Sequence, residues 1–177
     1  MPDGRLLLIV EDEPTFARTL ARSFERRGYR VIAASDPDEM QAVLERHAPT
    51  HAVIDLKLGG ASGLTCVEAL HARHPDARIV VLTGYASIAT AVEAIKLGAC
   101  HYLAKPSNTD DIEAAFEKVD GDTRAPVAEQ PSTFKTHEWE LIHRTLADAN
   151  FNISETARRL GMHRRTLARK LDKRRRD

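Results

Sequence analysis

A carboxylate that could accept a phosphoryl group or bind a metal stands near the middle of the chain. Asp55 directly follows Ala52-Val53-Ile54, which favour a buried strand, and a Gly-rich segment, residues 59–63, comes soon after. A buried strand should not end on an unpaired charge, because burying an isolated carboxylate is very costly. We therefore expect Asp55 to lie in a cleft at the mouth of the strand, where open α/β sheets bind ligands. The alternative is that Asp55 only caps the next helix.

Other polar residues follow other predicted strands in the same way: Glu11-Asp12, Thr83 and Lys105. In a parallel sheet these strand ends lie on one edge, so the side chains should converge. Clustered carboxylates raise one another's pKa values unless a cation binds. Mg²⁺, a hard cation that prefers oxygen ligands, would suit such a cluster beside a phosphoryl group.

The same residues divide into chemical roles. One of the carboxylates must remain free to attack phosphorus, as aspartates do when they form acyl phosphates. Lys105 would then balance the phosphate charge, and the Thr83 hydroxyl could bond a phosphate oxygen.

Apolar runs and capping residues predict the elements that must position this pocket. Strands are predicted at 6–10, 31–34, 52–54, 78–82 and 101–104, with a helix after each. Asp36 and Asn108 have the residue pattern of helix N-caps, and Ile88, Val92 and Ile95 predict the fourth helix. Five alternations of strand and helix predict an α/β fold, a doubly wound five-stranded parallel sheet of the flavodoxin-like kind.

A second, small all-α domain is predicted at the C-terminal end. We assign residues 1–119 to the first domain, 120–135 to a linker of Gly, Pro and polar residues, and 136–177 to the second domain. The formal net charge is +0, yet residues 151–177 contain 10 Lys/Arg against 3 Asp/Glu. A basic tail of this kind indicates a phosphate-backbone partner.

The tail has the layout of a helix-turn-helix. Asn152 begins one helix, Gly161 makes the turn, and Leu167 locks the second helix, whose N-terminal residues should enter the major groove of double-stranded DNA. The expected DNA contacts are Arg164, Arg165, Thr166, Arg169, Lys170 and Lys173. The alternative is a solvated charged face on a small helical bundle.

Two cysteines, Cys66 and Cys100, show no metal-ligand spacing and favour a reducing, cytoplasmic compartment, with the thiols as core residues rather than redox sensors. The sequence contains no apolar run long enough for a membrane span, so we expect no membrane partner.

Residues 5–120 resemble the receiver domain of bacterial response regulators, through Glu11-Asp12, Asp55, Thr83-Gly84, Lys105-Pro106 and Tyr102. The resemblance implies that Asp55 accepts a phosphoryl group from a sensor histidine kinase. It also implies a Mg²⁺ site made by Glu11, Asp12, Asp55 and the backbone carbonyl of Lys57. Thr83 and Tyr102 would reorient on phosphorylation, and the Lys105–Pro106 peptide is often cis. Tyr102 could instead be an ordinary half-buried strand residue.

One position departs from the receiver pattern. Many receivers have Pro four residues after the acceptor, where this chain has Gly59. The glycine should loosen the loop without removing a ligand.

Residues 152–170 resemble the Fis-type helix-turn-helix, and the whole chain resembles the short response regulators of the RegA/PrrA type, which govern photosynthesis, redox and energy-metabolism genes. The expected function is transcription control by phosphorylation of Asp55, through a homodimer formed on phosphorylation. The chain would not be an enzyme, apart from autodephosphorylation. The alternatives are a constitutive architectural DNA-binding protein whose receiver is a docking platform, and a Mg²⁺-dependent aspartyl-phosphate phosphatase. The sequence leaves open the kinase, the DNA site and the dimer surface, and whether phosphate dimerises the receivers or releases the tail.

Overall fold

The computed structural model describes residues 4–118 and 134–174 of the 177-residue chain, and in the second range the side chains of residues 138–172. The predicted alternation of strands and helices is confirmed. The first domain contains β1 (Leu6–Val10), α1 (Pro14–Glu25), β2 (Arg30–Ala34), α2 (Pro37–Leu44), β3 (His51–Ile54), β4 (Lys57–Leu58), β5 (Ala61–Ser62), α3 (Gly63–Arg73), β6 (Arg78–Thr83), α4 (Ile88–Lys96), β7 (His101–Ala104) and α5 (Thr109–Glu117). The sequence did not predict the β4–β5 hairpin.

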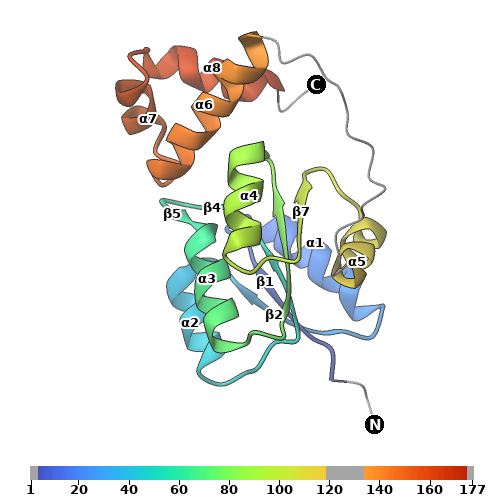
Figure 1. The fold of residues 1–177 in the computed structure, drawn as a ribbon. Helices are drawn as coiled ribbons and strands as arrows, with labels where there is room; N and C mark the ends of the chain where they lie inside the picture. Colours follow the sequence, from blue (N-terminus) through green and yellow to red (C-terminus); the bar gives the residue numbers. More distant parts are fainter. Residues whose placement is uncertain (1–3, 119–133, 175–177) are drawn as a thin grey trace.

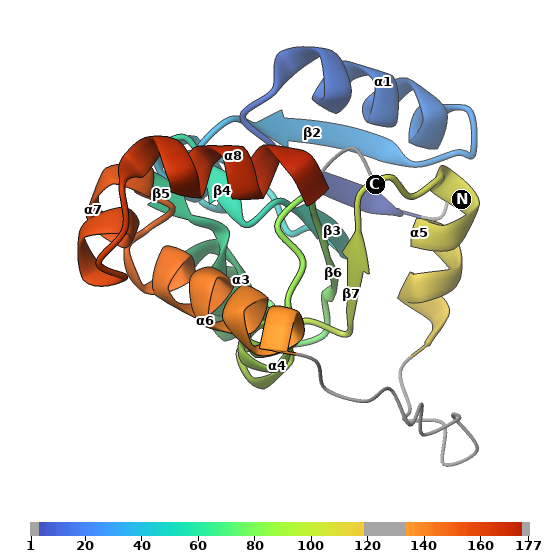
Figure 2. The ribbon, with the colours of Figure 1, turned by 90° about the horizontal axis from the view of Figure 1, so that it is seen from above.

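The central sheet has the strand order β2-β1-β3-β6-β7, and every neighbouring pair is parallel. Helices α1 and α5 lie on one side of the sheet, and α2, α3 and α4 lie on the other (Figures 1 and 2). The strand order reverses between β1 and β3, and open α/β sheets bind ligands at such a reversal. The doubly wound fold is thus confirmed, and it places the ends of β1 and β3 side by side.

Each face of the sheet has its own apolar core. Along β1, Leu7 and Ile9 point to the α1/α5 side, whereas Leu8 and Val10 point to the other side. All four are essentially inaccessible to solvent. Strands covered on both faces must be apolar at every position, which is why β1 is an uninterrupted hydrophobic run.

Side-chain caps start the helices. Asp36 accepts a hydrogen bond from the Glu39 N–H at the start of α2, and Asn108 forms a complete capping box at α5. Both caps were predicted. Helix α1 begins with a cap that was not predicted: the Glu13 carboxylate accepts from the N–H groups of residues 15 and 16.

Helix α4 turns its large apolar residues away from the sheet. Thr90 and Ala94 are buried, whereas Ile88, Val92 and Ile95 are exposed. The apolar spacing therefore predicted the helix correctly, although small residues make its contact with the domain.

The second domain contains α6 (Phe134–Asp148), α7 (Ile153–Arg159) and α8 (Arg164–Arg174). Asn152 caps α7 as predicted, and Gly161, at φ +64°, makes the turn into α8. The small core comprises the buried residues Ile142, Leu146, Ala157, Leu167 and Leu171. The helix-turn-helix prediction is confirmed, and most of the predicted linker lies outside the described residues.

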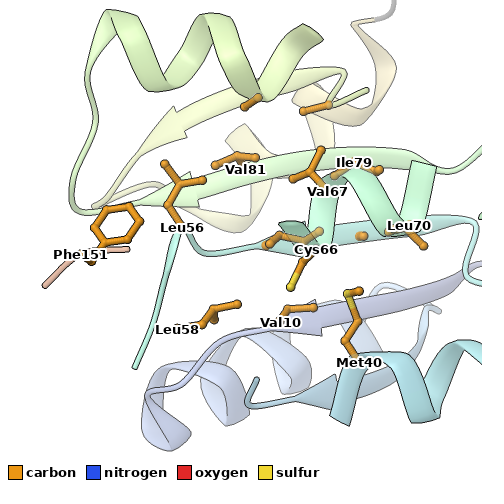
Figure 3. Close-up of a cluster of buried hydrophobic side chains, with 14 of the residues drawn as sticks. Val10, Met40, Leu56, Leu58, Cys66, Val67, Leu70, Ile79, Val81 and Phe151 are labelled. Carbon is orange, nitrogen blue, oxygen red and sulfur yellow. The ribbon is translucent and has the colours of Figure 1, made fainter. Parts of the chain in front are cut away.

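Helix α6 packs beside α4, so the two domains touch (Figure 1). Phe151, in the turn between α6 and α7, belongs to the same apolar cluster as Leu56 and Leu58 of the first domain (Figure 3). Its φ of 59° is unusual for a bulky residue. This backbone conformation presents the ring to the segment that directly follows Asp55.

Candidate functional site

The carboxylates of Glu11, Asp12 and Asp55 meet at the carboxyl ends of β1 and β3. One oxygen from each lies within 4.8 Å of the others. Glu11 and Asp55 are buried, and Asp12 is exposed at the mouth. Asp55 does not cap α3, because that role belongs to Ser62. The structure therefore brings the three acids together in the cleft that the sequence predicted.

Lys105 reaches this cluster from the end of β7. Its Nζ lies 2.7 Å from Oε2 of Glu11 and 3.0 Å from Oδ2 of Asp55. Burial lowers the pKa of Lys105, but the charges of Asp55 and Glu11 outweigh burial, so the net shift is upward. Burial raises the pKa of Glu11, and the Lys105 contact opposes that rise. The ammonium thus stays charged between two acids.

The donor set fits a hard divalent cation. Three carboxylates offer oxygen ligands, and Lys105 offsets only one of their negative charges. Asp12 is exposed, so an ion could enter from solvent. Lys57 follows Asp55 closely, and its backbone N–H donates to Asp55 Oδ1 at 3.4 Å. The backbone carbonyl of Lys57, the fourth ligand that the resemblance implies, stays a prediction.

Two glycines shape the segment around the acids. Gly59, at φ +63°, donates its N–H to Asp12 Oδ2 at 2.8 Å. The glycine that departs from the receiver pattern therefore anchors the loop to the acidic cluster, and a proline there would lack this donor. A Cβ on Gly63 would lie 1.9 Å from the Asp55 carbonyl oxygen, so α3 starts directly against the backbone of Asp55. We did not predict this role of Gly63, although a glycine at the first position of a helix was visible in the sequence.

Thr83 and Tyr102 connect the pocket edge to α4. The buried Thr83 hydroxyl accepts from the Tyr85 N–H at 3.2 Å. The Tyr102 hydroxyl lies 2.6 Å from the Thr90 hydroxyl and accepts from the Ser87 N–H at 3.3 Å. Burial raises the pKa of Tyr102. Its hydroxyl therefore holds the first turn of α4 and, among the described residues, makes no hydrogen bond to any of the three acids.

The second domain contacts the same segment. Glu140 of α6 accepts from the N–H groups of Ile88 and Ala89, at 3.3 and 3.4 Å, at the start of α4. His143 Nδ1 lies 2.9 Å from the Tyr85 carbonyl oxygen, and the Tyr85 ring packs edge-on against Phe151. The tail thus packs on the loops that follow Asp55 and Thr83. No sequence signal pointed to these contacts, because no local pattern reports packing between domains.

The predicted DNA contacts lie on α8. The side chains of Arg164, Arg165 and Arg169 are exposed, while Thr166 and Lys170 are half-buried. Lys170 pairs with Glu138 of α6 at 2.8 Å. Lys173 lies in α8, but its side chain is outside the described residues. The exposed arginines form a basic face that no part of the described chain covers.

A parallel sheet with an acidic pocket, joined to a helix-turn-helix, defines the class of protein. Residues 7–117 match the response regulator receiver domain family, and residues 134–173 match the Fis family of bacterial regulatory proteins. The chain belongs to the response regulators: it is a two-component DNA-binding regulator of transcription, with a receiver and a Fis-type helix-turn-helix.

Two regulators and one solved structure are similar over nearly the whole chain. The acid tolerance regulatory protein ActR of Sinorhizobium medicae is 50% identical over 98% of this chain and 88% of that protein. The photosynthetic apparatus regulatory protein RegA of Rhodobacter capsulatus is 48% identical over 96% of this chain and 92% of that protein. These matches confirm the resemblance to the RegA type.

The solved structure is a response regulator of Burkholderia pseudomallei with a phosphorylated aspartic acid, a calcium ion and citrate. It is 47% identical, covers 93% of this chain and 97% of its own, and has a TM-score of 0.64. Among the described helices of our chain, none is long and apolar enough to cross a membrane.

Proposed function

We propose that a sensor histidine kinase phosphorylates Asp55 in a Mg²⁺-dependent reaction, and that this event controls DNA binding by the tail. The observation that supports the proposal best is the position of Asp55. Its carboxylate is buried among Glu11, Asp12 and Lys105, and the segment that follows it packs against the DNA-binding domain. Asp55 therefore lies in the acidic pocket and at the start of the segment that contacts the tail.

In the transfer, an Asp55 carboxylate oxygen attacks the phosphorus of the kinase's phosphohistidine. A P–O bond forms as the P–N bond breaks, and the electron pair stays on the histidine nitrogen. Lys105, 3.0 Å from Asp55, offsets the charge of the entering phosphoryl oxygens. Mg²⁺, held by Glu11, Asp12, Asp55 and the Lys57 carbonyl, would neutralise the remaining negative charge. Thr83 would turn its hydroxyl to a phosphoryl oxygen, and Tyr102 would follow.

The chain accepts a phosphoryl group and turns over no substrate of its own beyond autodephosphorylation. A phosphatase working through an aspartyl phosphate needs a second carboxylate near the nucleophile as acid and base. The residues just after Asp55, where such an acid generally lies, are Leu56 and Lys57. Of the two other carboxylates in the pocket, Glu11 is paired with Lys105 and Asp12 would be a ligand of Mg²⁺. Steady release of phosphate from a phosphomonoester would decide for the phosphatase.

The tail would bind double-stranded DNA through the major groove. Arg164, Arg165, Thr166, Arg169, Lys170 and Lys173 would contact bases and phosphates from α8. Palindromic half-sites need two-fold proteins, so we place the active form as a homodimer. The relatives' names support acid-tolerance or photosynthesis genes as targets. Redox and energy-metabolism genes are our proposal from the resemblance to the RegA type, and a cytoplasmic location is our proposal from the DNA-binding tail.

The acceptor assignment is tested by intact mass spectrometry after incubation with acetyl phosphate and Mg²⁺. The unmodified chain should gain one phosphoryl group, and the Asp55→Asn variant should gain none. Asp76→Asn, which changes an exposed aspartate elsewhere, should behave like the unmodified chain. Stoichiometric labelling of Asp55→Asn would overturn the assignment.

A further inference from the structure

Four large apolar side chains are strongly exposed among the described residues, and all belong to two adjacent helices. Ile88, Val92 and Ile95 of α4 are 68%, 46% and 48% exposed, and Leu141 of α6 is 55% exposed. Residues spaced by four and then three positions lie on one face of a helix. Soluble proteins rarely expose contiguous apolar surface, and where they do it marks an interaction site.

Three of these four residues line a groove of about 890 Å³ between α4 and α6. Ile88 and Val92 line it from the receiver, and Leu141 lines it from the tail. The groove therefore belongs to neither domain alone. It exists because Glu140 and His143 hold α6 against the start of α4 and the Tyr85 loop.

The charges on this groove are balanced. Glu93 and Lys96 line it from α4, and Arg144 and Asp148 line it from α6. Both helices thus offer one acid and one base, while Glu140 is already bonded to the α4 N-terminus. A two-fold interface sets the same patch against itself, so a patch of one sign would repel its copy. A patch with both signs can pair with itself.

We propose that this α4–α6 surface, made of Ile88, Val92, Ile95 and Leu141 with the charged rim of Glu93, Lys96, Arg144 and Asp148, is where a second copy of the chain docks. The inference rests on the proposed function, because two-fold DNA sites need a pair of tails. Charge self-complementarity favours a second copy over a kinase or RNA polymerase. The exposed arginines of α8 stay outside the surface and remain available to DNA.

The position of the surface links it to the phosphorylation site. Ser87, the N-cap of α4, and Thr90, in its first turn, bond the Tyr102 hydroxyl, and the Tyr85 N–H donates to the Thr83 hydroxyl. A shift of Thr83 and Tyr102 on phosphorylation would move α4 relative to α6 and reshape the groove. Pairing across both domains would then fix the α8 helices of the two copies relative to each other.

The test compares Val92→Asp on α4 with Leu141→Asp on α6 in the full chain. Thr19→Asp, at an exposed position in the middle of α1, is the matched control. Analytical ultracentrifugation measures dimer dissociation with Mg²⁺ and beryllofluoride, and circular dichroism checks folding. Both groove variants should weaken the dimer at least tenfold, because a two-fold interface buries the new carboxylate of each copy. The control should dimerise like the unmodified chain.

A monomeric unmodified chain, or normal dimerisation by either groove variant, would overturn the proposal. If only Val92→Asp weakens the dimer, the interface uses α4 alone and the composite surface is wrong. If dimerisation is normal but transcription in vitro is lost, RNA polymerase is the occupant instead. Phosphoryl uptake is measured on the same proteins without beryllofluoride, after incubation with acetyl phosphate and Mg²⁺. Uptake without effects on dimerisation refutes the surface and leaves Asp55 as acceptor, whereas no uptake by the unmodified chain refutes the proposed function itself.

Discussion

Gly63 shows how tightly the backbone around Asp55, the proposed phosphoacceptor, is packed. A side chain at this position would collide with the Asp55 carbonyl oxygen, which belongs to rigid backbone. At Gly60, three residues earlier, an added Cβ would meet no atom within 4 Å, and the backbone there has no positive φ. The two glycines therefore offer a matched pair, one in contact with Asp55 and one in open space.

We predict that Gly63→Ala displaces Asp55, lowers stability by about 2 kcal/mol as expected for overpacking, and slows phosphoryl uptake at least tenfold. Gly60→Ala should change neither quantity measurably. Urea unfolding and mass spectrometry of uptake from acetyl phosphate check the two effects. Normal uptake by Gly63→Ala would show that the close approach to Asp55 is not needed for the reaction.

Lys105 contacts two of the carboxylates that would hold the proposed cation, so the ammonium and the cation would compete for them. Lys105→Met should destabilise the metal-free protein by about 2 kcal/mol, because it leaves buried acids without their partner. Mg²⁺ should then raise the Tm of this variant more than that of the unmodified chain, in which the ammonium already contacts Glu11 and Asp55. Lys118→Met, at an exposed position, is the control for thermal melts. Equal Mg²⁺ effects in all three proteins would contradict the competition with Lys105, and no Mg²⁺ effect in any of them would contradict a cation site at these acids.

At the scale of elements, the start of α4 makes hydrogen bonds with both domains. Tyr102 bonds its first turn from within the receiver, and Glu140 bonds the same turn from α6. A carboxylate near a helix N-terminus is favourable because it meets free N–H groups and the positive end of the helix dipole. The start of α4 is therefore where the two domains can influence each other.

Removing the Glu140 carboxylate should loosen this contact. We predict that Glu140→Ala speeds hydrogen exchange of the Ile88 and Ala89 amides about threefold to tenfold, in line with a helix-end interaction of ~1 kcal/mol. Glu138→Ala removes a carboxylate from the same helix that pairs only with Lys170 of the tail among the described residues. It should leave these two amides unchanged, and equal exchange in both variants would mean that Glu140 does not hold α4.

The elements that the sequence predicts well have strong local signals. The buried strands are continuous apolar runs, and Asp36, Asn108 and Asn152 supply side-chain caps that act within a few residues. The β4–β5 hairpin was missed because two-residue strands have no periodicity to detect. Apolar spacing located α4 but did not show that Thr90 and Ala94, rather than the large residues, face the sheet.

The acidic pocket was predictable for a topological reason. Parallel strands bring their carboxyl ends to one edge, so residues far apart in sequence, such as Glu11 and Lys105, could be placed together before any distance was known. The packing of Glu140, His143 and Phe151 on the receiver could not be predicted, because contacts between domains depend on surfaces formed only after both have folded.

For the whole molecule, the formal net charge of +0 is the sum of an acidic receiver and a basic tail. Residues 1–120 contain 13 Lys/Arg and 18 Asp/Glu, whereas residues 151–177 contain 10 and 3. The receiver should repel the DNA backbone and the tail should attract it, so DNA affinity should fall steeply with salt. The exposed arginines of α8 also allow a second interpretation, in which the tail binds DNA whatever the state of Asp55.

The affinity of the full chain for a duplex containing its binding site, measured by fluorescence anisotropy at fixed salt with and without Mg²⁺ and beryllofluoride, separates the two interpretations. Coupling between sites is typically worth about 5-fold to 150-fold in affinity. We predict at least a fivefold gain for the unmodified chain and none for Asp55→Asn. The same affinity in both conditions for the unmodified chain would contradict the claim that phosphorylation of Asp55 controls DNA binding.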